Sequence, residues 1–151
     1  MQTFRRYVAE FIASFIVVFV AAGAVVADVF LTRTRLTDSF GPLGIIAAYG
    51  LAVAVAMLAV MPISGAHVNP VISISAYVAR RLSLQDTTGY VVAQVAGGIV
   101  AAFLLRGIVP KTAFEFVNGG VPGLAAGISP LKGTAIEVVL TFFLAFTFWA
   151  V

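Results

Sequence analysis

The residues best suited to act on a solute lie in the uncharged segment 64–71, whose sequence is SGAHVNPV. Small residues before an Asn-Pro pair favour the start of a helix, because Asn caps helices well and Pro fits the first helical position. A helix starting at Pro70 directs free N–H groups and its positive dipole end at whatever lies in front of Asn69. The segment therefore predicts binding and orientation of a polar solute.

Other kinds of chemistry are not favoured. Ser64 and His67 are close in sequence, but no third group stands nearby to orient the histidine, so a hydrolase is not expected. The chain has no cysteine, hence no disulfide framework, thiolate nucleophile or cysteine metal site. Its nine Lys and Arg are scattered, and no nucleic-acid partner is expected. The sequence predicts neither an enzyme nor a cofactor.

The composition places this segment in a lipid bilayer. Hydrophobic residues make up 62% of the chain and charged residues 10%, with a mean hydropathy of +1.11. A membrane-spanning helix needs about 20 mostly apolar residues. The first apolar run follows Arg5-Arg6 as in a signal peptide, but it is too long for one and carries Glu10 near its start. Four spans are predicted, at about 7–30, 43–61, 85–106 and 134–151.

The stretch between the second and third spans is predicted to enter and leave the membrane on the same side. Pro62 and Ser64-Gly65 interrupt the helical pattern, and a new helix over 69–79 stops at Arg80-Arg81. Such a helix is about 14 Å long, half a membrane. Non-helical backbone at that depth is tolerated where it lines a cavity or is buried in protein, so the carbonyl groups before Asn69 are expected to face a lumen. A single kinked helix is the alternative.

An internal repeat is marked by two acidic residues. Glu10 opens the sequence EFIASF, and Glu137 opens the similar sequence EVVLTF. Repeats in membrane proteins usually form pseudo-symmetric halves, and an odd number of spans in the first half inverts the second. The single membrane domain 1–151 is thus divided into a first repeat, 1–127, and the start of a second, 128–151. Both glutamates are expected to be buried carboxylates that accept loop N–H groups, with ion or proton transport as the alternative.

Taken together, these residues resemble the aquaporin, or major intrinsic protein, family in a bacterial-type form. The Ser-Gly-Ala-His-x-Asn-Pro core is highly specific to that family. Further matches cover the whole chain: Ala9-Glu10-Phe11, Ala93-Gln94 with Gly97-Gly98, and Ile136-Glu137 with Thr141-Phe142. The chain departs from the family by having Val71 where Ala is usual and Ser73 where Thr is common. It also lacks a second Asn-Pro-Ala motif, so it is expected to be truncated before that motif.

The resemblance implies an all-α integral membrane fold, an aquaporin-like inverted-repeat bundle. Three spans and one re-entrant half-helix would form the first repeat, followed by the first span of the second. The implied function is a passive, single-file water channel in which Asn69 orients the solute and helps exclude protons. The resemblance assigns the site residues as follows: pore motif Asn69, Pro70 and Val71; carbonyl ladder Gly65, Ala66, His67 and Val68; selectivity constriction Tyr49.

The resemblance also implies partners and location. The partners are water or a small uncharged solute, the lipid bilayer and, at full length, three further copies in a homotetramer. The location is a multi-pass position in the cell membrane, taken as a bacterial inner membrane, with the N-terminus in the cytoplasm. Water is preferred because the compact segment 121–132 is similar to that of water-type members. A glycerol or small-polyol facilitator and an inverted-repeat ion or metabolite transporter are the alternatives.

Overall fold

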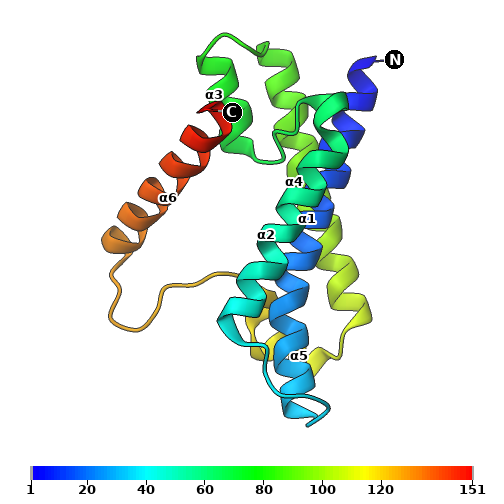
Figure 1. The fold of residues 1–151 in the computed structure, drawn as a ribbon, viewed down its shortest axis with the longest axis vertical. Coiled ribbons are helices and arrows are strands. Elements are labelled where there is room, and N and C mark those ends of the chain that lie inside the picture. The colour runs from blue at the N-terminus through cyan, green and yellow to red at the C-terminus, as the bar shows by residue number, and fades with distance from the viewer. Residues whose placement is uncertain (1, 151) are drawn as a thin grey trace.

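The computed structural model describes residues 2–150, which fold into helices joined by loops, with a longer irregular connection before the last helix (Figure 1). Four helices are long and apolar enough to cross a membrane: α1 (Gln2–Arg33), α2 (Gly41–Ser64), α4 (Leu84–Ile108) and α6 (Pro130–Ala150). Three shorter elements connect them: α3 (Pro70–Val78), α5 (Lys111–Phe116) and the 3-10 turn η1 (Asn118–Gly120). The all-α membrane fold predicted from the sequence is confirmed, and the four long helices overlap the four predicted spans.

Helices α1, α2 and α4 form the packed body of the molecule, with α1 against both of the others (Figure 1). Small residues allow the close approach. Ala13 and Ala56 are fully buried where α1 meets α2. On α4, a Cβ added to Gly97 would lie 2.3 Å from the carbonyl oxygen of Phe11 in α1. Because lipid tails are as apolar as leucine, close packing of small residues is what holds membrane helices together.

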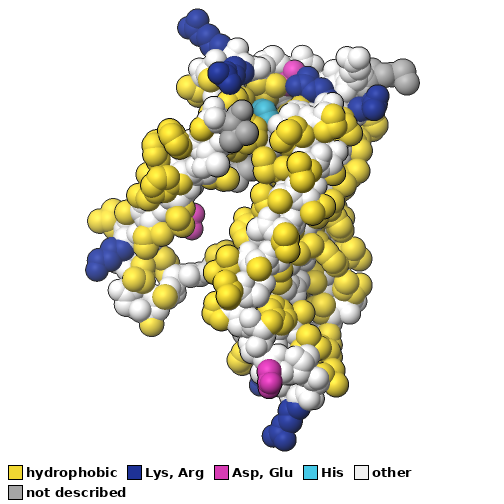
Figure 2. Space-filling model, in the orientation of Figure 1, with side chains coloured by type: hydrophobic (Ala, Val, Ile, Leu, Met, Phe, Trp, Pro, Cys, Tyr) yellow, Lys and Arg dark blue, Asp and Glu magenta, His cyan; other side chains and the backbone are white. Residues whose placement is uncertain are grey.

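The outer surface of the bundle is predominantly apolar (Figure 2). Leu43, Leu58 and Phe103 are 79%, 71% and 68% exposed, and the buried core consists mainly of alanines and valines. A soluble protein rarely exposes so large an apolar surface. Lys and Arg side chains lie toward the ends of the helices instead (Figure 2). This distribution fits a protein whose sides face lipid and whose ends reach the headgroups.

The end of α2 differs from the prediction. The helix continues through Pro62 to Ser64 and stops at Gly65, whose φ is 84° and whose N–H donates to the Met61 carbonyl at 3.1 Å. Glycine commonly ends helices in this left-handed conformation because it has no Cβ. Pro62 is tolerated in the last turn, and the break therefore comes at the glycine.

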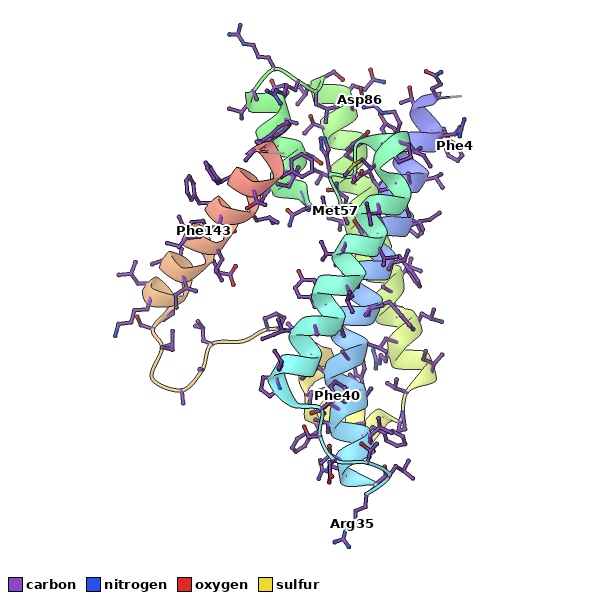
Figure 3. All side chains as sticks on the ribbon, in the orientation of Figure 1. Phe4, Arg35, Phe40, Met57, Asp86 and Phe143 are labelled. Atoms are coloured by element: carbon purple, nitrogen blue, oxygen red, sulfur yellow. The ribbon has the colours of Figure 1, made fainter. Side chains whose placement is uncertain are left out.

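Helix α6 diverges from the packed body and meets α3 near its own C-terminal end (Figures 1 and 3). There the indole Nε1 of Trp149 donates to the Ser75 hydroxyl at 3.0 Å, and the Arg81 guanidinium lies 4.7 Å from the centre of the indole ring. Glu137, in the middle of α6, is exposed. Within residues 2–150 this part of α6 does not pack against the body of the bundle, so the role of Glu137 as a buried carboxylate stays a prediction.

The segment 111–120, which lies between the third and fourth predicted spans, forms α5 and η1. It packs against α1: the Arg33 guanidinium lies 4.2 Å from the Phe116 ring centre, and Gly120 approaches the backbone of Ala22 so closely that an added Cβ would lie 2.9 Å away. Its six-residue helix is too short and too irregular in pattern for hydrophobic periodicity to reveal it.

Candidate functional site

The half-helix α3 begins at the Asn-Pro pair. Asn69 has extended backbone angles, φ −143° and ψ 131°, and its side-chain oxygen accepts the N–H of Val71 at 2.8 Å. Pro70 occupies the first helical position, where a missing N–H costs nothing. Within residues 2–150 no acceptor lies within hydrogen-bond distance of the Asn69 side-chain nitrogen. The cap thus uses the oxygen of the amide and leaves its two N–H donors available.

The loop before Asn69 has an unusual backbone. Ala66 and Val68 adopt positive φ values of 54° and 52°, directly after Gly65 at 84°. A β-branched residue rarely adopts this left-handed conformation. Each such residue costs of order 1–3 kcal/mol and persists only where its surroundings hold it. The loop therefore needs specific partners.

Glu10 of α1 supplies those partners. Its side chain is fully buried, and each of its two oxygens accepts two hydrogen bonds. One oxygen accepts the Ser64 hydroxyl at 2.5 Å and the His67 N–H at 3.1 Å. The other accepts the Val68 N–H at 2.6 Å and the Gln94 amide at 2.7 Å. Four donors match the four lone-pair positions of a carboxylate, which is the geometry that a structural role for Glu10 requires.

The loop carbonyl groups divide into two sets. The Ser64 carbonyl accepts the Tyr90 hydroxyl at 2.7 Å, and the Val68 carbonyl accepts the Ser14 hydroxyl at 3.3 Å. Within residues 2–150, no protein group donates to the carbonyls of Gly65, Ala66 and His67. Backbone carbonyls require a donor. Gly65 is exposed and His67 is half-buried, so these two residues can meet a solute, whereas Ala66 is fully buried in this structure. Val68 retains its second lone pair. Within residues 2–150, three members of the predicted ladder 65–68 thus have no protein donor and one is engaged by α1, and the ladder itself stays a prediction.

The His67 side chain packs against residues of three helices. Its Nδ1 lies 3.1 Å from the Ser73 hydroxyl, and its ring meets Tyr90 of α4 and Phe148 of α6 edge to face, at centroid distances of 5.1 and 5.7 Å. Ser73 is also bonded to Gln94 at 3.1 Å. The imidazole therefore joins α3, α4 and α6 around the loop, while the backbone carbonyl of His67 is one of the three that have no protein donor within residues 2–150.

A second group of hydrogen-bonding residues, which the sequence did not predict, stabilises the loop at the end next to Ser64. The Arg6 Nε donates to the Tyr90 hydroxyl at 2.8 Å, and Arg6 also pairs with Asp86 at 3.3 Å. Asp86 accepts the Tyr7 hydroxyl at 3.1 Å as well. Asp86 lies near the start of α4, at the same end of the molecule as the α1 N-terminus (Figure 3). The sequence signal that could have revealed this cluster is the presence of charged and hydroxyl side chains, Arg6, Tyr7 and Asp86, at the starts of two apolar spans.

Replacing Tyr90 by Phe is expected to lower the free energy of unfolding by about 1–3 kcal/mol. The ring contacts remain, but the buried Ser64 carbonyl and the Arg6 Nε lose their partner. The measurement is the unfolding of the detergent-solubilised protein. Tyr77→Phe is the control, because Tyr77 is 43% exposed and its hydroxyl forms no hydrogen bond within residues 2–150. Equal stability of the two variants would contradict the proposed support.

Tyr49, the expected constriction residue, lies on α2 and is 50% exposed. Fifteen residues separate it from Ser64, roughly 22 Å of helix. The structure therefore places Tyr49 toward the opposite end of the bundle from the Glu10 cluster and does not bring it into contact with that cluster. Its constriction role stays a prediction.

Comparison with known proteins gives a consistent result. The family model described as "Major intrinsic protein" matches residues 1–151. The chain is 32% identical to aquaporin TIP2-1 of Arabidopsis thaliana over 99% of this chain and 58% of the relative. It is 37% identical to aquaporin TIP2-1 of Zea mays, over 97% of this chain and 56% of the relative. It is also 34% identical to aquaporin PIP2-7 of Arabidopsis thaliana, over 95% and 50%.

Two consequences follow from these matches. The chain spans about half the length of the curated relatives it matches. These relatives are plant proteins, which gives no support to the expectation of a bacterial-type channel in a bacterial inner membrane.

Proposed function

Because this chain belongs to the major intrinsic protein family, a family of membrane channels and not of enzymes, we propose that the full-length protein is a passive, single-file channel for water. One observation carries the proposal. Within residues 2–150, three consecutive loop carbonyls without protein donors precede Asn69, whose amide has two N–H groups without protein acceptors. A solute that moves along this path meets acceptors first and a donor pair at the start of the half-helix.

This order of groups suits water. A water molecule donates to the carbonyls of Gly65 and His67, on either side of the buried Ala66, and then turns its oxygen toward the amide of Asn69. The positive end of the α3 dipole reinforces that orientation and opposes protons and cations. Pro70 and Val71 follow directly, and Val71 is 39% exposed at this end of α3, which suits a partner motif packed against it.

The pore is proposed to be completed by a second, inverted half that begins near residue 128. The recurrence of Glu10 as Glu137 supports this division, as does the greater length of the relatives. In that arrangement Glu137 would hold the second loop as Glu10 holds the first. Tyr49 would narrow the outer mouth, and four full-length copies would assemble in the membrane.

The two alternatives are less well supported. An ion or metabolite transporter would use Glu10 as a titrating or ion-binding group, but all four of its lone-pair positions are already engaged. A glycerol or small-polyol facilitator would share the loop and differ at the constriction, where Tyr49 is the one proposed member. Relatives of both the TIP and PIP types carry the name aquaporin, which favours water.

The test is osmotic shrinkage of liposomes that contain the protein at its full natural length. Water flow faster than in empty vesicles is expected, with a low activation energy. Glycerol uptake should stay at the rate of empty vesicles. Shrinkage no faster than in empty vesicles would refute the proposed channel. Rapid glycerol uptake would favour a polyol facilitator over a water channel.

Asn69→Asp is expected to reduce water permeability per protein about three- to ten-fold while leaving α3 folded. The carboxylate still caps the Val71 N–H, but the N–H donors are lost, and one hydrogen bond contributes about 0.5–1.5 kcal/mol. Permeability and helical content are measured on the same preparation. Asn118→Asp, at an exposed site in η1, is the matched control and should retain full permeability. Unchanged permeability in Asn69→Asp would show that the amide donors do not contact the solute.

A further inference from the structure

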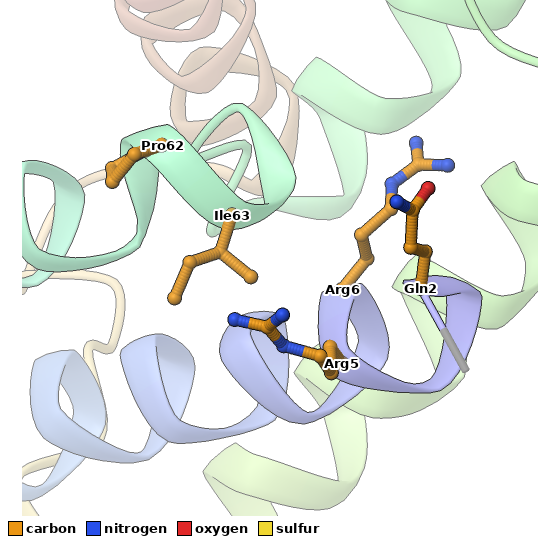
Figure 4. A pocket seen from close by; sticks show the side chains of 5 residues that line it. All are labelled: Gln2, Arg5, Arg6, Pro62 and Ile63. Carbon is orange, nitrogen blue, oxygen red and sulfur yellow. The ribbon is translucent and has the colours of Figure 1, made fainter.

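A cavity of about 270 Å³ lies between the first turns of α1 and the last turn of α2. Gln2, Arg5 and Arg6 line it from α1, and Pro62 and Ile63 line it from α2 (Figure 4). The Arg5 guanidinium extends toward Ile63, whereas Arg6 extends in a different direction, with Gln2 near it in this view (Figure 4). The cavity thus has one basic, polar wall and one apolar wall.

The charges of the two arginines are not equally balanced. Arg6 is matched by Asp86 at 3.3 Å and also donates to Tyr90. Within residues 2–150, no carboxylate lies within 4.0 Å of the Arg5 guanidinium. The cavity therefore carries an excess of positive charge, and a guanidinium fork matches the geometry of a phosphate.

A second cavity, of about 280 Å³, continues from the first and shares Arg5 and Ile63 with it. It follows the seam between α1 and α2 past Val8, Ile12 and Val60, and apart from Arg5 its lining is apolar. From Arg5 to Ile12 the seam is roughly 10 Å long. An apolar groove provides no binding energy to a small free anion, whereas a hydrocarbon chain lowers its free energy by moving from polar surroundings into the groove.

We propose that the two cavities are one binding site for an anionic phospholipid. The phosphate lies at Arg5 and Gln2, and one acyl chain follows the groove along Val8 and Ile12. At about 48 Å, α1 is longer than the hydrocarbon core of about 30 Å, so its first turns reach the headgroup region where such a phosphate is found.

The lipid would also support the pore loop. Ala9 and Ile63 line the groove and are the chain neighbours of Glu10 and Ser64, which bond to each other on the inner side. A lipid that fills the groove holds α1 and α2 together at this point. Bound lipid is therefore expected to raise the unfolding temperature of the protein.

The test uses the full-length protein in maltoside detergent, titrated with dioleoyl-phosphatidylglycerol and dioleoyl-phosphatidylcholine. Native mass spectrometry measures lipid binding, and a thermal scan measures the unfolding temperature. Phosphatidylglycerol is expected to bind more tightly and raise the unfolding temperature. Arg5→Gln should weaken this binding about five-fold. Arg35→Gln, in the exposed α1–α2 loop at the other end of the molecule, should leave it unchanged (Figure 3).

A second pair of variants tests the groove. Val8→Trp fills it and should weaken binding of the diacyl lipid, whereas Val92→Trp, on the exposed face of α4, should not. Equal binding of the two lipids, or equal losses in Arg5→Gln and Arg35→Gln, would overturn the proposal. Displacement of the lipid by glycerol 3-phosphate alone would show a simple anion site instead. A changed oligomeric state with unchanged lipid binding would make the seam an interface between copies.

Discussion

Replacement of Glu10 by Ala is expected to lower the free energy of unfolding by at least about 3 kcal/mol and to abolish water permeability. The substitution leaves the N–H groups of His67 and Val68 without an acceptor, together with the buried Gln94 amide. Each buried donor left unsatisfied costs about 1–3 kcal/mol. The left-handed conformations of Ala66 and Val68 then lose the carboxylate that holds the loop, and two hydrogen bonds of 3.3 Å, from Ser14 to the Val68 carbonyl and from the Ala66 N–H to the Ser64 hydroxyl, remain.

Glu10→Gln separates a structural role from proton coupling. Glutamine has the same shape, but its amide nitrogen would face two donors at one of the two oxygen positions. A structural role therefore predicts losses of stability and permeability nearly as large as in Glu10→Ala. A transporter predicts a folded protein with normal stability and lost proton coupling. Unfolding in detergent and stopped-flow shrinkage measure the two quantities on one preparation.

The control is Glu115→Gln, on α5. Glu115 is exposed, and its one ion pair within residues 2–150 is with Lys111, four residues away, at 3.7 Å. Exposed pairs of this kind contribute a few tenths of a kcal/mol, so this variant should match the unmodified protein. If Glu10→Gln also had the stability and permeability of the unmodified protein, the four hydrogen bonds of Glu10 would not be what holds the loop.

The first half of the site could be predicted from the sequence because it is local. Asn69 and Pro70 determine where α3 begins independently of the surrounding structure, because capping and the fixed φ of proline act within one helical turn. Glu10 could be predicted for a different reason: a carboxylate inside an apolar span must have protein partners. The loop was the part of the chain with unsatisfied N–H groups, so pairing the two required no three-dimensional information.

The remainder could not be predicted because it depends on packing between distant segments. Tyr90 of α4 reaches the Ser64 carbonyl at the end of α2 because both helices pack against α1, and the pattern of one apolar span does not reveal which residues of another span lie against it. The exposure of Glu137 has a similar origin: its type and spacing match Glu10, but its helix diverges from the bundle. The hydrogen bond from Ser14 to the Val68 carbonyl likewise depends on how α1 packs against the loop, and the carbonyl ladder stays a prediction.

Gly97→Val is expected to have the second large effect, although the residue touches no solute. A Cβ at this position would lie 2.3 Å from the Phe11 carbonyl oxygen and 3.1 Å from the Phe15 nitrogen. Both atoms belong to the backbone of α1, so no side chain can move aside and the two helices must separate. Overpacking of this kind costs about 1–3 kcal/mol, and rigid backbone on both sides favours the upper end of that range.

The separation also reaches the pore loop, because Phe11 follows Glu10 and Gly97 lies one turn after Gln94. Widening the α1–α4 contact therefore lengthens the 2.7 Å bond between Glu10 and Gln94, and permeability should fall even in molecules that still fold. The matched control is Gly107→Ala in the same helix, where an added Cβ meets nothing within 4 Å. Relief of the glycine's chain entropy should there raise stability by about 0.5–1 kcal/mol. Unfolding in detergent and vesicle shrinkage are measured for both variants. If close packing at Gly97 positions the loop, Gly97→Val lowers the stability and Gly107→Ala raises it. Equal stability and permeability of the two variants would mean that the packing at Gly97 does not position the loop.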